Sequence, residues 1–183
     1  RNKLVRTIFA PNTIKLSEVP LAGDIGITYH YPAYTGLKSQ KIEGGNGNIR
    51  APKGTEVELR ALTEFSVRKA SLEQFAFGQT QSRIIPMTVK GDHQLTTKLS
   101  VTKSGGYFFA LVTPSGDHLR ERNQYSIVAV EDEIPKITML SPLEDIEIRN
   151  NDTIPIVWSA RDDYGIRQVT LVIEPDSSGV TAS

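Results

Sequence analysis

The chain of 183 residues contains no cysteine, which excludes disulfide bonds, thiolate metal sites and cysteine nucleophiles. It also lacks any run approaching the roughly 18 apolar residues that a membrane-spanning helix requires. No signal-peptide pattern is present. The chain begins at Arg1 rather than methionine, so we expect it to be a piece of a longer protein.

An excess of charge of either sign is also missing. Lys and Arg together number 21, Asp and Glu together number 21, and the sequence pI is about 7.0. Binding to a polyanion would therefore require a local basic patch. The longest basic cluster, Leu119-Arg120-Glu121-Arg122, is interrupted by a glutamate and falls in a predicted hairpin loop. We therefore expect no nucleic-acid partner.

Alternating apolar and polar residues, typical of half-buried strands, dominate residues 24–131. Ile25, Ile27 and Tyr29 alternate with polar residues or glycine, and the same period recurs in later segments. The segments predicted to form strands are 24–31, 56–61, 66–77, 83–90, 94–102, 107–112 and 125–129. Together they indicate an all-β fold, an immunoglobulin-like β-sandwich over residues 22–132.

The prediction of a sandwich depends most on residues 103–135. Tyr107, Phe109 and Leu111 share one face of a strand, and a Pro-Ser-Gly-Asp turn separates it from a second strand through Ile127. We interpret the pair as the closing hairpin of the sandwich. Another turn is predicted at Gly44–Gly47, where the Asn-Gly pair suits a two-residue hairpin. No phosphate-binding loop is expected there, because its lysine, hydroxyl residue and following helix are absent.

After Pro135 the strand pattern restarts. Short strands are predicted around Ile137 and Met139, from Ile154 to Ala160, and around Leu171. Trp158 is expected to pack in the interior. Residues 134–183 are about half of what a sandwich requires. They are therefore predicted to be the N-terminal part of a second immunoglobulin-like domain, the first strands of a truncated sandwich.

One connecting segment joins the two predicted domains, and another precedes the first domain. Glu133, Ile134 and Pro135 form the predicted hinge, since proline restricts the backbone there. Residues 1–21 are a lead-in segment. Its mixture of basic and apolar residues suits an ordinary approach to the first strand, with a membrane-proximal segment as the alternative.

Four motifs occur in a fixed order: YPAYTGL at 31–37, APKGTEV at 51–57, EDEIPKI at 131–137 and ARDDYGI at 160–166. This order resembles a poorly characterised family of bacterial envelope proteins. Members carry tandem immunoglobulin-like domains after N-terminal membrane segments and before a long coiled or disordered tail. The resemblance implies a periplasmic or cell-envelope location and tethering to a membrane through segments outside this chain. It implies no enzymatic activity.

Acidic residues at the domain junction are the candidate metal ligands: Glu131, Asp132, Glu133, Asp162 and Asp163. Calcium prefers six to eight oxygen ligands, and such a site would stiffen the junction. The simpler interpretation is that Asp162 and Asp163 stabilise a turn and that the linker acids are solvated. Otherwise no cofactor is expected.

Three tyrosines, Tyr29, Tyr31 and Tyr34, are candidates for an aromatic sugar-binding surface. Because Tyr29 and Tyr31 share one face of an alternating strand, we expect at least part of this set to belong to the core instead. The histidines His30, His93 and His118 show no metal-ligand spacing, with His30 on a strand and the other two in predicted loops. No catalytic motif selects a nucleophile or a pair of carboxylates. We therefore expect a protein that is not an enzyme.

These observations favour a non-catalytic structural or protein-binding module that serves as a rigid spacer and docking surface. A calcium-stiffened adhesion module is the first alternative, and a carbohydrate-binding domain is the second. A protein partner is expected to bind by adding a strand to an exposed sheet edge. Self-association is a further option.

Overall fold

The computed structural model describes residues 14–147, 149 and 152–174. The chain divides between Asp132 and Glu133 into two compact units, which are described separately. The described residues form strands and one short 3-10 turn, η1 (Ala33–Thr35), so the predicted all-β class is confirmed. None of the helical structure in the described ranges is long and apolar enough to cross a membrane.

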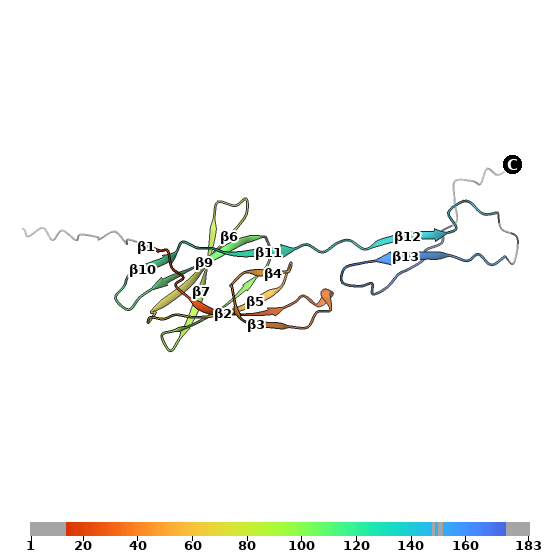
Figure 1. The fold of residues 1–183 in the computed structure, drawn as a ribbon. Coiled ribbons are helices and arrows are strands. Elements are labelled where there is room, and N and C mark those ends of the chain that lie inside the picture. Colours follow the sequence, from red (N-terminus) through yellow and green to blue (C-terminus); the bar gives the residue numbers. More distant parts are fainter. Residues whose placement is uncertain (1–13, 148, 150–151, 175–183) are drawn as a thin grey trace, which may run out of the picture. The chain divides into compact units, whose positions relative to one another are not determined.

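The first unit is one curled sheet (Figure 1). Its strands are β1 (Ile14–Ser17), β2 (Gly23–His30), β3 (Gln40–Gly45), β4 (Ile49–Pro52), β5 (Glu56–Leu62), β6 (Lys69–Ala76), β7 (Ser82–Lys90), β8 (Gln94–Ser100), β9 (Gly105–Val112), β10 (His118–Glu121) and β11 (Tyr125–Val130). Their order is β1-β10-β9-β6-β7-β8-β5-β2-β3, and β11 lies between β9 and β4.

Strand β7 joins the two halves of this sheet. Its residues 82–87 pair with β6, and its residues 88–90 pair with β8. One half thus contains β1, β10, β9, β6, β11 and β4, and the other contains β8, β5, β2 and β3. Buried residues from both halves form one apolar cluster, which is the arrangement of a β-sandwich.

The core follows the predicted alternation. Val57, Leu59 and Ala61 on β5 are fully buried, while the intervening residues point to solvent. From the other half, Leu72 and Phe109 are equally buried and are paired in register between β6 and β9. Full burial of one such large apolar side chain stabilises the fold by about 1.5–3 kcal/mol.

The predicted Gly44–Gly47 hairpin is wrong. Strand β3 pairs with β2, whereas β4 runs parallel to β11, so the segment between them crosses from one half of the sheet to the other. Gly47 has a φ of 79°, and Tyr107 donates its hydroxyl proton to the Gly47 carbonyl at 2.6 Å. An Asn-Gly pair satisfies any turn that needs a positive φ, and a crossover uses it equally well.

The closing hairpin also differs in detail. Strand β9 pairs through residues 110–112 with β10 and through residues 105–107 with β11, so β10 and β11 form one interrupted strand along the same edge. Residues 118–121 were expected in a loop, and this expectation is wrong for His118 and Glu121 alike. Strand β1, which lies in the predicted lead-in segment, pairs in parallel with β10. This part of the lead-in therefore belongs to the first unit. Residues 1–13 lie outside the described residues.

The second unit contains a two-stranded sheet of β12 (Lys136–Ser141) and β13 (Val157–Arg161). Met139 lies opposite Trp158, and Ile137 lies opposite Ala160. Trp158 is 47% exposed, so its predicted burial is wrong. The described residues of this unit include no buried side chain, because no second layer covers the strands there.

Three further predictions for this unit fail, hold only in part or fall on residues that the structure does not describe. The strand expected around Val169, Leu171 and Ile173 does not form, and residues 166–174 are irregular. The strand expected from Ile154 begins only at Val157. The sequence Asn150-Asn151 also predicts a turn, and both residues lie outside the described residues. A third strand needs a neighbour that satisfies its main-chain groups, and among the described residues only β12 and β13 pair in this unit.

The crossover geometry predicts a large difference between two glycines that share a positive φ. A Cβ atom at Gly47 would lie 2.5 Å from Cδ1 of Tyr125, whereas one at Gly78 (φ 77°) would meet nothing within 4 Å. Gly78→Ala should cost about 1 kcal/mol for the left-handed backbone alone. Gly47→Ala should cost about 1–3 kcal/mol more, because the aromatic ring must move.

Urea unfolding followed by far-ultraviolet circular dichroism measures both variants. Fluorescence would report on the wrong unit, since the single tryptophan is Trp158. Equal losses of stability at the two glycines would contradict the described packing of Tyr125 over the crossover.

Candidate functional site

The core face of the first unit changes from apolar to polar at one end of the sheet. Leu72 pairs in register with Phe109 and Ile85, and all three are buried. Two residues further along β6, Gln74 pairs with Arg83 on β7. Because strand side chains alternate, Gln74 and Arg83 lie on the same face as the core residues.

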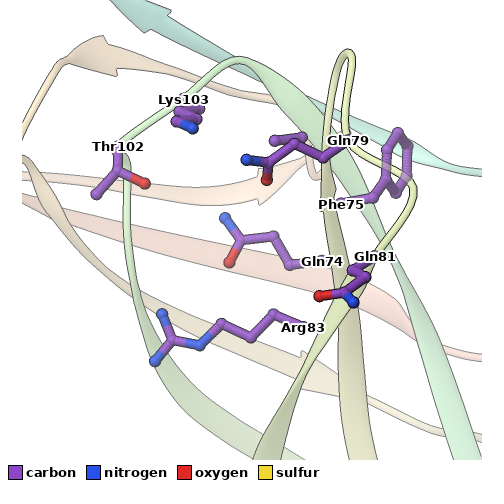
Figure 2. Close-up of a pocket in the computed structure, with 8 residues that line it drawn as sticks. Gln74, Phe75, Gln79, Gln81, Arg83, Thr102 and Lys103 are labelled. Atoms are coloured by element: carbon purple, nitrogen blue, oxygen red, sulfur yellow. The ribbon is translucent and has the colours of Figure 1, made fainter.

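This polar row lines a cavity of about 180 Å³ (Figure 2). Strands β6 and β7 and the turn between them supply Gln74, Gln79, Gln81 and Arg83. The segment between β8 and β9 supplies Thr102 and Lys103. In Figure 2, Gln74, Gln79 and Arg83 extend in the same direction from the hairpin, toward the segment that carries Thr102.

The cavity is rich in hydrogen-bonding groups and carries positive charge. Its lining contains two cations, Arg83 and Lys103, and no carboxylate. Within the described ranges, neither cation lies in an ion pair. Among the described residues, the side-chain amides of Gln74, Gln79 and Gln81 likewise form no hydrogen bond. These groups are therefore available to a ligand.

Phe75 borders the same cavity, but its ring belongs to the opposite face of β6. Figure 2 shows the ring directed away from the side chains of Gln74 and Arg83. The ring packs against Phe77 and Phe108, with centroids 6.3 and 6.4 Å away. The cavity therefore offers polar contacts without an aromatic platform.

A second unusual group is the carboxylate of Glu121, which is only 3% exposed. It lies where β10 ends and the strand is interrupted before β11. Its Oε1 atom accepts a hydrogen bond from the Leu21 N–H at 2.6 Å, and Oε2 accepts one from the Phe109 N–H at 3.3 Å. Burial raises the pKa of Glu121, and hydrogen bonds from Leu21, Phe109, Ala22 and Tyr125 oppose that rise. Glu121 thus fastens the β1–β2 connection to β9.

Two of the predicted calcium ligands, Glu131 and Asp162, interact with residues of their own unit. Lys53 Nζ lies 3.2 Å from Glu131 Oε1, within the first unit. In the second unit, Asp162 Oδ2 accepts a hydrogen bond from the Tyr164 N–H at 3.2 Å, as expected for a turn. Across the part of the chain that the structure describes, no group of three or more acidic, histidine or cysteine residues could hold a metal ion. Calcium binding at Glu131, Asp132, Glu133, Asp162 and Asp163 remains a prediction.

The three candidate tyrosines have different surroundings. Tyr29 is buried in the core and stacks on Tyr31 with ring centroids 5.8 Å apart. Tyr31 donates its hydroxyl proton to Gln40 Oε1 at 2.8 Å. Tyr34, in η1, is 49% exposed and donates to the Lys53 carbonyl at 3.1 Å. Tyr29 is therefore a packing residue, and sugar binding by the other two stays a prediction.

The remaining predicted residues are not among those that line the cavity. Glu133, Ile134 and Pro135 connect β11 to β12 outside any strand, and the Ile134 side chain is 85% exposed. His30 Nδ1 lies 3.2 Å from Ser39 Oγ, and His93 Nδ1 lies 3.0 Å from the Thr63 carbonyl oxygen.

Neither the cavity nor the buried carboxylate was predicted from the sequence. A signal for the cavity existed, because Gln74 and Arg83 occupy core-face positions of strands that were correctly predicted. Glu121 was missed because its neighbours Arg120 and Arg122 made the segment resemble a solvated loop.

Comparison with known proteins gave no match: no family model, no curated protein and no solved structure corresponds to this chain.

The raised pKa of Glu121 predicts a specific pH dependence of stability. A carboxyl group whose pKa is higher in the folded state contributes stability that is fully present below its unfolded pKa and is lost as pH rises through the folded value. Glu121→Gln keeps the shape and removes this titration. The free energy of unfolding of the wild type minus that of Glu121→Gln should therefore fall as the pH rises above the ordinary pKa of a glutamate, about 4.

Urea unfolding at a series of pH values measures this difference. Glu56→Gln, at an exposed position on β5, controls for the loss of one negative charge. A difference that grows with pH would contradict burial as the dominant influence on the Glu121 carboxylate.

The calcium hypothesis predicts heat release when calcium reaches about 1 mM in a calorimetric titration, and loss of that heat when Asp162 and Asp163 are both changed to alanine. A titration without heat would exclude the stiffened junction. Equal heat in the wild type and the double variant would place calcium elsewhere.

Proposed function

We propose that this protein is a non-catalytic structural and protein-binding module of a bacterial envelope protein. In this proposal, an extended strand of a partner protein binds to the two-stranded sheet of β12 and β13, called the β12–β13 ribbon below. The observation that carries this proposal is the uncovered apolar face of the ribbon. Ile137, Met139 and Trp158 are 59, 46 and 47% exposed, and the strand register places them on one face.

The ribbon has the hydrogen-bonding capacity for such a partner. Among the described residues, β12 and β13 pair only with each other, so each has one open edge. An isolated two-stranded ribbon is marginally stable, and a third strand satisfies main-chain groups and covers apolar surface together.

Charge favours a different protein over a second copy. Lys136 and Arg161 lie opposite each other in register, and like charges in that position repel. Two ribbons that paired in parallel and in register through β12 would bring a second Lys136 to the same place. A partner strand with alternating apolar residues and a nearby carboxylate would relieve the repulsion.

The envelope location rests on the resemblance carried by the motifs at 31–37, 51–57, 131–137 and 160–166. The immunoglobulin-like assignment is supported by the sandwich of the first unit, in which β4 runs parallel to β11. The spacer role is supported by the division of the chain at Asp132, followed by a proline that restricts the connection. The non-catalytic assignment rests on the lack of any catalytic motif in the sequence.

Site-specific photo-crosslinking in the source cells tests the binding surface. A benzophenone amino acid at position 139 should form an adduct with one protein, through a segment of alternating apolar residues. The same amino acid at position 138, on the other face of β12, should give at most a trace of that adduct, because Thr138 is directed away from the apolar face.

The Lys136→Glu variant should reduce the yield at position 139 by reversing the charge next to the partner strand. An adduct with a second copy of the chain would replace the partner by self-association. Equal adducts at positions 138 and 139, or none at either, would overturn the proposal.

A further inference from the structure

We propose that the polar cavity at the end of the first unit binds a carboxylated sugar, a hexuronate residue of a glycan, through Arg83 and Lys103 together with the glutamines of the β6–β7 hairpin (Figure 2). This inference does not depend on partner binding by β12–β13, since it concerns the other unit.

The two cations select a negatively charged ligand. Arg83 extends into the cavity beside Gln74, and its guanidinium group has the planar geometry that binds a carboxylate through two parallel hydrogen bonds. Lys103 adds a second positive charge from the segment between β8 and β9. The lining holds no carboxylate that would neutralise either cation.

The three amides distinguish a sugar acid from a simple anion. Each glutamine amide has an NH₂ group that donates hydrogen bonds and a carbonyl oxygen that accepts them. Phosphate and sulfate have mainly acceptor oxygens, so they offer few hydrogen-bond donors to the carbonyl groups of Gln74, Gln79 and Gln81, which would stay bonded to water. The hydroxyl groups of a sugar both donate and accept, so a hexuronate matches the cations and the amides at once.

The size of the cavity limits the ligand to a single sugar unit. Sites for drug-sized molecules enclose about 300–1,000 Å³. The volume here is about 180 Å³, and the lining residues are in large part exposed. We therefore expect weak binding of one uronate residue, with a dissociation constant of about 1 mM.

Titration of the isotope-labelled full chain, followed by nuclear magnetic resonance, tests this inference with three probes: glucuronate, glucose and inorganic phosphate. Glucuronate should shift the side-chain amide signals of Gln74, Gln79 and Gln81 and saturate them. Glucose and phosphate should each bind at least about tenfold more weakly, because each lacks one half of the matching groups.

The Arg83→Gln variant should weaken glucuronate binding about tenfold or more and leave the response to glucose unchanged. Arg68→Gln is the matched control, since Arg68 is exposed, lies outside the cavity and also lacks an ion pair among the described residues. It should bind glucuronate like the wild type. Circular dichroism verifies that each variant is folded.

Three results would overturn the inference. Glucuronate could leave the glutamine signals unshifted. Phosphate could bind as tightly as glucuronate, which would identify a general anion site. Arg68→Gln could weaken binding as much as Arg83→Gln, which would identify non-specific attraction to surface charge.

Discussion

Strand β7 imposes the constraint on which the first unit depends. Because it bonds with β6 through one part and with β8 through the next, it holds both halves of the sheet against a single core. Each chain segment that crosses between the halves must then satisfy its polar main-chain groups away from the strand ladders. The Tyr107 hydroxyl does this for the Gly47 carbonyl, and the Thr55 hydroxyl does it for the Pro52 carbonyl at 2.6 Å.

The same constraint explains a carboxylate in the interior. Where the strand is interrupted between β10 and β11, main-chain N–H groups of β9 and of the β1–β2 connection lose their regular partners. Glu121 accepts hydrogen bonds from Leu21 and Phe109 and so replaces those partners. The hydrogen bonds partly offset the cost of removing its charge from water. An apolar residue of similar size would leave two donors unsatisfied, which is also costly.

Features that depend on the alternation of side chains could be predicted from the sequence. Val57, Leu59 and Ala61 were placed correctly because half-burial leaves a period of two in the residues themselves. Features that depend on distant pairing could not. The Asn-Gly segment favours a positive φ but does not determine which strand its successor pairs with. Trp158 has an apolar side chain that favours burial, but it can be buried only where a second layer covers the strand. Arg83 and Gln74 could be predicted in part. The alternation of their strands places them on the core face, but nothing in the sequence indicates that Lys103 lines the same cavity.

Ion pairs elsewhere in the first unit can be compared with the unpaired Arg83 of the polar cavity. Arg60 lies 2.8 Å from Glu43, Arg122 lies 2.6 Å from Glu18, and Arg120 lies 3.1 Å from Glu73. This surface therefore supplies acids to several of its arginines, including one on the face of β6 opposite the cavity. Arg83, on the other face of the same sheet, has no such acid among the described residues. A carboxylate brought by a ligand would give Arg83 the kind of ion pair that Arg60, Arg120 and Arg122 form within the chain.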